Sequence, residues 1–201
     1  MTPTTPKADV RSLAASELRV DQVDGKKRIV GYAAVFNSLS EDLGGFREII
    51  RPGAFAAALA GADVRLVVNH DPSLILGRTR NGTLRLTEDS RGLRYEADPP
   101  DTQMARDYAA LVERGDLAES SFRFYMFDDP SRGQVWRSEP TGVIREITEF
   151  SRIDDVSIVA YPAYRATEVS VRSLDALRSA RDRDDAWATR AHFRLRLAES
   201  A

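Results

Sequence analysis

Short apolar runs separated by turn-forming residues make up most of this chain, and the pattern predicts a body built mainly from β-strands. The first clear run covers residues 28–36 and ends at the turn-prone pair Asn37-Ser38. A loop is expected at 41–51, which contains Gly44-Gly45, and Pro72 is expected to break the strand that reaches His70. Further strands are expected at 63–70, 76–79, 83–87, 91–97, 120–127, 134–137, 143–149 and 155–161.

Two helices are expected among these strands. At 102–114, Thr102 can cap the first turn and Gly115 can end the last one. The apolar residues of this helix share one face: Met104, Tyr108, Leu111 and Val112. A shorter helix is expected at 52–61. The fold class is therefore α+β, mainly β, as a small β-barrel or sandwich surrounded by a few helices.

The ends of the chain differ from its body in composition. Residues 1–16 are expected to be a flexible leader, 17–170 to form one domain, and 171–201 to be a charged helical or partly disordered tail. No apolar run approaches the roughly 20 residues that span a bilayer. The chain is therefore expected to be soluble and cytosolic.

Composition excludes several classes of function. Hydrophobic residues make up 42% of the 201 residues and charged residues 30%, which fits a packed core rather than wholesale disorder. The net charge of −2 argues against strong general nucleic-acid binding. The chain has no cysteine, which excludes disulfides, Cys-ligated zinc and a thiol nucleophile.

Histidine is scarce, and this makes His70 a candidate acid–base residue, because unperturbed imidazole titrates near neutral pH. The other of the two histidines, His192, lies in the charged tail. His70 ends an apolar run, where a purely structural histidine is also common. The residues alone leave both interpretations open.

Two later segments supply partners for His70. Ser121 lies in a strand candidate and becomes nucleophilic if a base takes its proton. Asp155 stands at the edge of the apolar run 156–159 and needs a partner if it is buried. An imidazole would be such a partner, as in a Ser-His-Asp arrangement, although Asp155 also fits a solvated strand end.

Five segments in order resemble the tailed-phage prohead proteases, serine peptidases that mature capsids and are related in fold to herpesvirus assemblins. The resemblance covers roughly residues 28–165. The matching segments are GYAAVFN at 31–37, EIIRPGAF at 48–55, NHD at 69–71 with LGR at 76–78, GDL at 115–117 with SFRF at 121–124, and DVSIV at 155–159 with PA at 162–163.

The resemblance implies a function and its residues. It implies a serine endopeptidase with Ser121 as nucleophile, His70 as base and Asp155 as third member. The implied substrates are the scaffold segment of the major capsid protein precursor and the protease itself, cleaved inside the procapsid in the host cytoplasm. No cofactor, metal, nucleic acid or membrane is expected to take part, and self-association remains open.

The chain departs from the family pattern at two positions. The family usually has Glu where Asp155 stands, and Asp is one methylene shorter, so His70 would have to sit closer to the strand. Arg123 takes a place that is commonly Gly. Residues two apart in a strand share a face, so Arg123 is expected beside Ser121, either near a substrate carbonyl or paired with a carboxylate at the rim. Ser120 would face the opposite side.

Two other functions compete with this interpretation. One is a non-catalytic capsid assembly or scaffolding protein of the same fold. The other is a hydrolase of small esters or of a metal-bound substrate. Against a metal site, the body offers His70 with no second histidine or cysteine, and against a lipase-like enzyme, no serine lies in a G-x-S-x-G motif.

Overall fold

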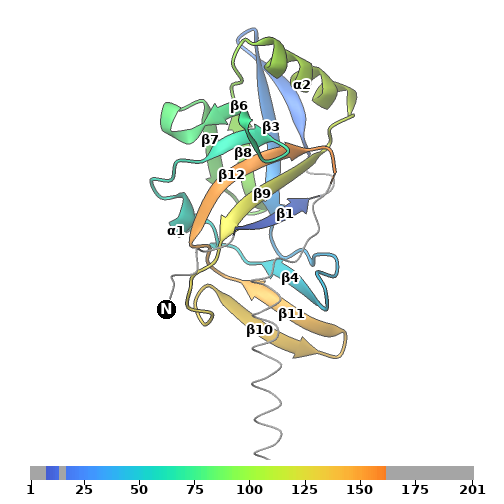
Figure 1. Cartoon of the computed structure of the whole chain (residues 1–201), viewed down its shortest axis with the longest axis vertical. Helices are drawn as coiled ribbons and strands as arrows, with labels where there is room; N and C mark the ends of the chain where they lie inside the picture. Colours follow the sequence, from blue (N-terminus) through green and yellow to red (C-terminus); the bar gives the residue numbers. More distant parts are fainter. Residues whose placement is uncertain (1–7, 14–16, 162–201) are drawn as a thin grey trace, which may run out of the picture. The chain divides into compact units, whose positions relative to one another are not determined.

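Residues 8–13 and 17–161 are described by the computed structural model, and within them the chain forms three β-sheets (Figure 1). The expected tail at 171–201 lies outside these residues. The five-stranded sheet has the order β1 (Asp9–Leu13), β9 (Glu119–Tyr125), β12 (Arg152–Val159), β5 (Arg65–Val68), β6 (Asp71–Arg78). The four-stranded sheet has the order β2 (Arg19–Val23), β3 (Lys26–Val35), β8 (Gly92–Ala97), β7 (Leu84–Glu88). The three-stranded sheet has the order β10 (Gln134–Glu139), β11 (Gly142–Ile147), β4 (Phe46–Ile50).

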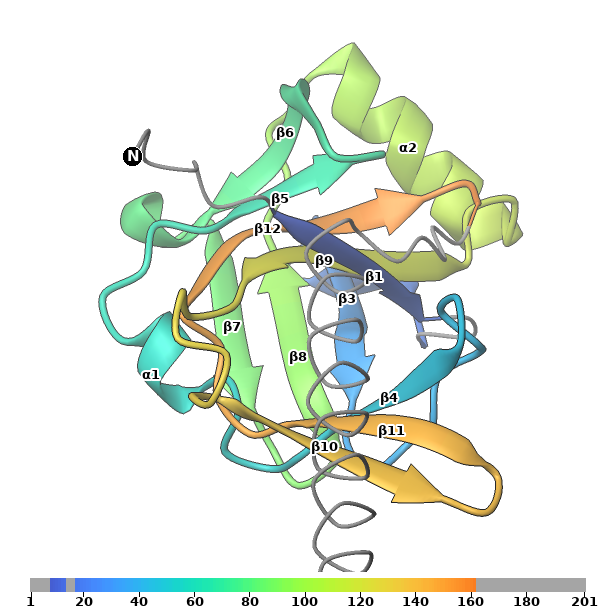
Figure 2. The same ribbon diagram turned by 60° about the horizontal axis from the view of Figure 1, so that its bottom comes forward.

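The two larger sheets pack face to face, and the mainly β, sandwich-like architecture expected from the sequence is confirmed. Figures 1 and 2 show β1, β9 and β12 in front of β3 and β8. Each sheet of the described region has two free ends in its strand order, so none closes into a barrel. No helix within this region is long and apolar enough to cross a membrane.

A cluster of phenylalanines fills one end of the core. Phe122 and Phe124 from β9 stack with ring centroids 5.1 Å apart. Phe55 and Phe150 cover them, with centroids 4.6 Å apart, and all four side chains are at most 1% exposed. This burial fixes which face of β9 points inward, because alternate residues of a strand point to opposite faces.

The longer helix has the cap and the stop that were predicted from the sequence. α2 runs over Gln103–Arg114, and the Thr102 hydroxyl accepts a hydrogen bond from the Ala105 N–H at 3.3 Å. Gly115 ends the helix in the left-handed region with φ 80°. The second helix is shorter than expected, because α1 covers only Ala56–Leu59, and a 3₁₀ turn, η1, lies at Thr79–Asn81.

Three expectations about the chain's course were wrong. The expected leader contains β1, which pairs antiparallel with β9, and the expected loop at 41–51 contains β4, which pairs parallel with β11. The strand that reaches His70 turns and resumes at once as β6, with Pro72 inside it. β6 is the last strand of its sheet, where a residue without an N–H is tolerated.

A buried ionic cluster explains why the segment at β1 is ordered. The Arg11 guanidinium on β1 forms a two-nitrogen ion pair with Glu48 on β4, with Nη2 3.0 Å from Oε1. Arg145 on β11 binds the same carboxylate with Nη1 2.6 Å from Oε1, and its Nε donates to Gln134 Oε1 at 2.6 Å. Burial alone would raise the pKa of the Glu48 carboxyl, but the two guanidiniums outweigh it and lower that pKa. The cluster therefore joins the small sheet to β1.

Removing the Glu48 charge should make the protein less stable in a pH-dependent way. Because the folded-state pKa of Glu48 is lowered, its contribution is complete above its unfolded value of about 4.3 and is lost as pH falls through the folded pKa. Urea unfolding at pH 7 should therefore show Glu48→Gln about 3 kcal/mol less stable than wild type. The gap should narrow at about pH 3.

Glu113→Gln is the matched control, because Glu113 pairs with Lys27 at the surface and should change stability by less than about 1 kcal/mol. An equal loss in both variants, or a gap for Glu48→Gln that does not change with pH, would contradict this account of the cluster.

Candidate active site

His70 occupies a two-residue turn between β5 and β6. Asn69 and His70 both lie in the left-handed region, with φ 49° and 57°, which is the pattern of a type I′ hairpin turn. Three hydrogen bonds from β12 and the residue after it hold this turn. They join Asn69 N–H to the Ile158 carbonyl at 2.8 Å, Ala160 N–H to Asn69 Oδ1 at 3.0 Å, and His70 N–H to Ser157 Oγ at 2.9 Å.

Asp155 meets the imidazole from β12. Its Oδ1 lies 2.5 Å from His70 Nδ1, and its side chain is 9% exposed. The pairing of β12 with β9 shifts register between Ile153 and Asp155, which marks a β-bulge or similar irregularity. Bulges re-aim side chains next to functional sites. Asp155, although one methylene shorter than the Glu usual in the family, thus contacts the imidazole directly.

Ser121 lies on the other side of the imidazole. Its Oγ is 2.8 Å from His70 Nε2, and the residue is fully buried. Ser121 is paired with Ser157 across β9 and β12, and Asp155 is paired with Arg123. Cross-strand partners share a face, so these groups gather on the face of the sheet away from the phenylalanine cluster.

Ser120 points into the core, as expected from the period of the strand. Its Oγ forms a hydrogen bond of 2.7 Å with the Tyr95 hydroxyl, and both residues are fully buried. Burial raises the pKa of Tyr95, against the opposing effect of the Ser120 hydrogen bond. Gly31 makes room for this ring, since a Cβ there would lie 2.6 Å from the Tyr95 hydroxyl oxygen. The Ser120 hydroxyl thus takes part in a hydrogen bond inside the core.

Arg123 lies at the rim of the site, on the same face as Ser121. Its Nε is 3.4 Å from Asp155 Oδ2, and its Nη2 donates to the His70 carbonyl at 3.2 Å. Of the two roles expected for it, the structure shows the carboxylate pairing. The guanidinium therefore anchors the turn that carries His70 to the acid behind it.

A cavity of about 440 Å³ opens beside the imidazole. His70, Arg123, Asp155, Arg65 and Pro72 are among the residues that line it. The imidazole is therefore accessible from this side, and Ser121 contacts β1 through the Arg11 carbonyl. Among the described residues, no three His, Asp or Glu side chains are placed to hold a metal ion.

The three side chains form a chain of polar contacts suited to proton transfer. A carboxylate at Nδ1 favours the tautomer with its proton on that nitrogen, which leaves Nε2 able to accept a proton from Ser121. The Ser121 hydroxyl has a second acceptor, because its Oγ also donates to the Arg11 carbonyl at 2.8 Å. A hydroxyl carries one hydrogen, so the two acceptors compete for it.

Sequence reasoning gave no role to Ser157 or Arg11. Ser157 was visible only as the third residue of DVSIV, and its Oγ bonds both the His70 N–H and, at 3.2 Å, the Val67 carbonyl. A fully buried serine two residues from an acid on one strand shares the acid's face, and that spacing was the available signal. Arg11 lay within a segment whose composition indicated no structure.

Comparisons with known proteins add a family and a structural neighbour. The family model described as caudovirus prohead serine protease matches residues 15–180. The structure of the capsid assembly protease gp21 of bacteriophage T4 is similar to the chain, with a TM-score of 0.50 and 12% sequence identity. That similarity covers 79% of this chain and 100% of the T4 chain, and at this identity it concerns the fold alone. No curated protein matches the chain.

Removing the Ser157 hydroxyl should loosen the His70 turn. Ser157→Ala deletes the acceptor of the His70 N–H, so the free energy of unfolding should fall by about 1 kcal/mol. Ser121 should react with a fluorophosphonate about tenfold more slowly. The loss is moderate because His70 is still present, but lies in a poorer position to take the Ser121 proton.

Ser73→Ala is the matched control, since Ser73 is exposed and its hydroxyl bonds Asp71 on the same strand. A Ser157→Ala protein that reacts at the wild-type rate would show that this hydroxyl does not position His70.

Proposed function

The chain belongs to the caudovirus prohead serine protease family, and from that membership we propose that it is a capsid-maturation endopeptidase with Ser121 as nucleophile, His70 as general base and Asp155 as the acid that orients it. One observation carries the assignment of residues. His70 contacts Ser121 Oγ through Nε2 at 2.8 Å and Asp155 through Nδ1 at 2.5 Å. Nucleophile, base and orienting group in hydrogen-bond reach are the signature of this mechanism.

The proposed substrates are the scaffold segment of the major capsid protein precursor and the protease chain itself. Family membership supports action on capsid proteins, and the T4 neighbour is named a capsid assembly protease. The proposed site of action is the inside of the procapsid in the host cytoplasm. Enclosure in a shell gives high local concentrations, so an enzyme with weak affinity for its substrate can still work at useful rates.

The first half of the reaction forms an acyl-enzyme. His70 Nε2 takes the proton of Ser121 as Oγ attacks the scissile carbonyl carbon, and the carbonyl oxygen becomes an oxyanion. The imidazolium then gives its proton to the leaving amine, and the peptide C–N bond breaks. Asp155 at Nδ1 stabilises the positive charge that His70 carries between these steps.

The second half of the reaction releases the acyl group. A water molecule enters, His70 Nε2 takes one of its protons, and the resulting hydroxide attacks the ester carbonyl. The Ser121 Oγ leaves and regains its proton from His70. The cavity beside the imidazole gives water a route to the base from the side away from β1.

Serine substitutions test the nucleophile directly. In co-expression with the major capsid protein precursor of the same phage, Ser121→Ala should abolish precursor cleavage, because it removes the hydroxyl that contacts His70 Nε2. Ser120→Ala should still cleave, since Ser120 bonds Tyr95 inside the core. Gel analysis and intact mass spectrometry of the precursor provide the readout.

Persistent cleavage with Ser121→Ala, or loss with Ser120→Ala in a folded protein, would move the nucleophile elsewhere. Absence of cleavage by every version, wild type included, would favour a non-catalytic assembly role instead.

Asp155 and its neighbour Asp154 form a matched pair for testing the acid. Asp155→Asn should lower the cleavage rate about 10³- to 10⁴-fold, because an amide does not hold the required tautomer. Asp154→Asn should change it less than about twofold, because Asp154 pairs with Arg152 at the surface. Equal rates for the two variants would remove Asp155 from the mechanism.

A further inference from the structure

The N-terminal strand covers the proposed nucleophile. β1 is the end strand of the five-stranded sheet and pairs antiparallel with β9, with Ser12 opposite Ser121 and Arg11 opposite Phe122. Figures 1 and 2 show it lying alongside β9. Without β1, the edge of β9 that bears Ser121 would be open to another extended segment.

The contact between β1 and Ser121 involves the reacting atom. Ser121 Oγ lies 2.8 Å from the Arg11 carbonyl oxygen and 2.8 Å from His70 Nε2. When the hydroxyl donates to Arg11, its single hydrogen is withheld from the base. β1 therefore blocks access to Ser121 and competes with His70 for its proton.

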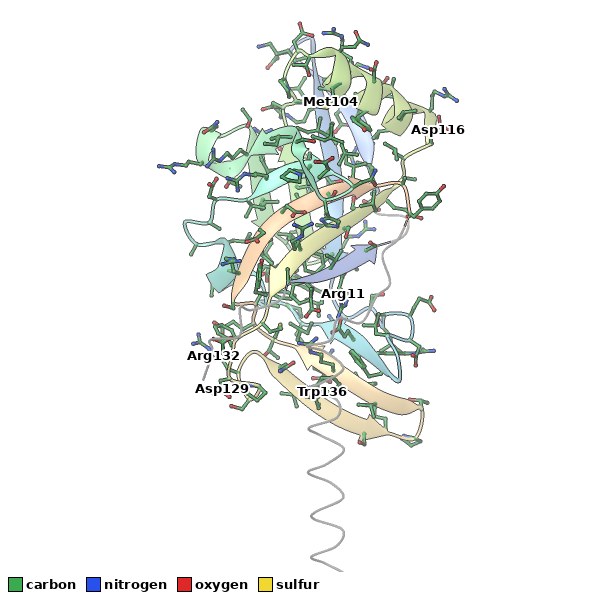
Figure 3. All side chains as sticks on the ribbon, viewed as in Figure 1. Arg11, Met104, Asp116, Asp129, Arg132 and Trp136 are labelled. Carbon is green, nitrogen blue, oxygen red and sulfur yellow. The ribbon has the colours of Figure 1, made fainter. Side chains whose placement is uncertain are left out.

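The Arg11 side chain lies in a buried binding site. Arg11 is opposite Phe122 in the sheet, so its side chain lies on the inner face, and the guanidinium is 5.5 Å from the centroid of the Phe124 ring. Glu48 receives it through two nitrogens, and Arg11 is 6% exposed. Figure 3 shows Arg11 on β1, the strand next to β9. Planar two-point binding of this kind distinguishes arginine from lysine and from neutral side chains.

Glu48 also has a charged partner outside β1. Arg145 binds Glu48 Oε1 at 2.6 Å and is itself buried against Gln134 and Trp136. The carboxylate therefore has one charged partner outside β1, and its other side receives the guanidinium that β1 supplies. Two opposing guanidiniums also explain why the pKa of Glu48 is lowered despite burial, which by itself raises it.

β1 does not fill the groove that it occupies. A cavity of about 190 Å³ remains beside it, with Ser12, Leu43, Glu48 and Phe122 among its lining residues. Extended peptides that add to a sheet edge gain affinity from main-chain hydrogen bonds and specificity from pockets for alternate side chains.

We propose that a substrate segment binds along the edge of β9 that β1 occupies in this structure. Glu48 then selects an arginine in the substrate segment that replaces β1. The inference rests on the proposed function, because the edge is a substrate site only if Ser121 is the nucleophile. The substrate class is an extended peptide segment with an arginine whose carbonyl lies beside Ser121. β1 holds the enzyme in a blocked state until such a segment displaces it.

Full-length wild type, Arg11→Ala and Arg19→Ala test this proposal. Arg19 pairs with Asp21 at the surface of β2, so its substitution is the matched control. Arg11→Met is a second variant that keeps the aliphatic stem packed, in case the alanine variant does not fold, and circular dichroism checks each protein. The probe is a fluorescein-labelled peptide with the sequence of residues 8–13, compared with the same peptide carrying uncharged citrulline in place of arginine.

Fluorescence anisotropy should show that the Arg11→Ala protein binds the arginine peptide at least tenfold more tightly than wild type or Arg19→Ala does. The citrulline peptide should bind it at least tenfold more weakly than the arginine peptide. A fluorophosphonate should label Ser121 at least fivefold faster in Arg11→Ala than in wild type, and added arginine peptide should slow that labelling.

Equal affinity for the two peptides, or identical behaviour of wild type and Arg11→Ala, would overturn the proposal even if Ser121 is labelled. Arginine-dependent binding without labelling of Ser121 in any protein would support the strand site and overturn the proposed catalytic function. The two ideas therefore fail in distinguishable ways.

Discussion

The position of β12 between β9 and β5 is the constraint on which the candidate site depends. β12 pairs antiparallel with β9, which aligns Ser157 with Ser121, and parallel with β5, which aligns Ser157 with Val67. The chain then reaches His70 three residues after Val67, in a turn that hydrogen-bonds back to β12. Because a register slip by one residue would reverse every side chain, these two pairings together determine whether the three groups meet.

Two sets of ion pairs, one on each face of β9, hold the elements around the site in place. Arg123 contacts both the Asp155 carboxylate and the His70 carbonyl, and thus links Asp155 to the turn that carries His70. On the opposite face of β9, Glu48 receives Arg11 and Arg145 in the absence of bulk water. Buried charges of this kind are costly unless they are fully paired, so the second cluster makes the placement of β1 specific.

The features that could be predicted from the sequence are those determined by residues close together in the chain. α2 has its cap at Thr102 and its stop at Gly115, and the alternation along β9 separates Ser120 from Ser121, so one segment is enough to infer each. The convergence of His70, Ser121 and Asp155 came from the family resemblance of ordered segments. β1 and β4 were missed because their partners are distant in the sequence: β1 pairs with β9, β4 pairs with β11, and Arg11 pairs with Glu48, 37 positions away.

The most direct test of the central claim is to map the covalent adduct of diisopropyl fluorophosphate on the folded, full-length protein. Peptide mapping by mass spectrometry, on wild type and on Arg11→Ala, should place a single phosphoryl group on Ser121, and His70→Ala should remove it. An adduct on Ser120 or another residue, or no adduct in either protein, would contradict the assignment of Ser121 as a nucleophile activated by His70.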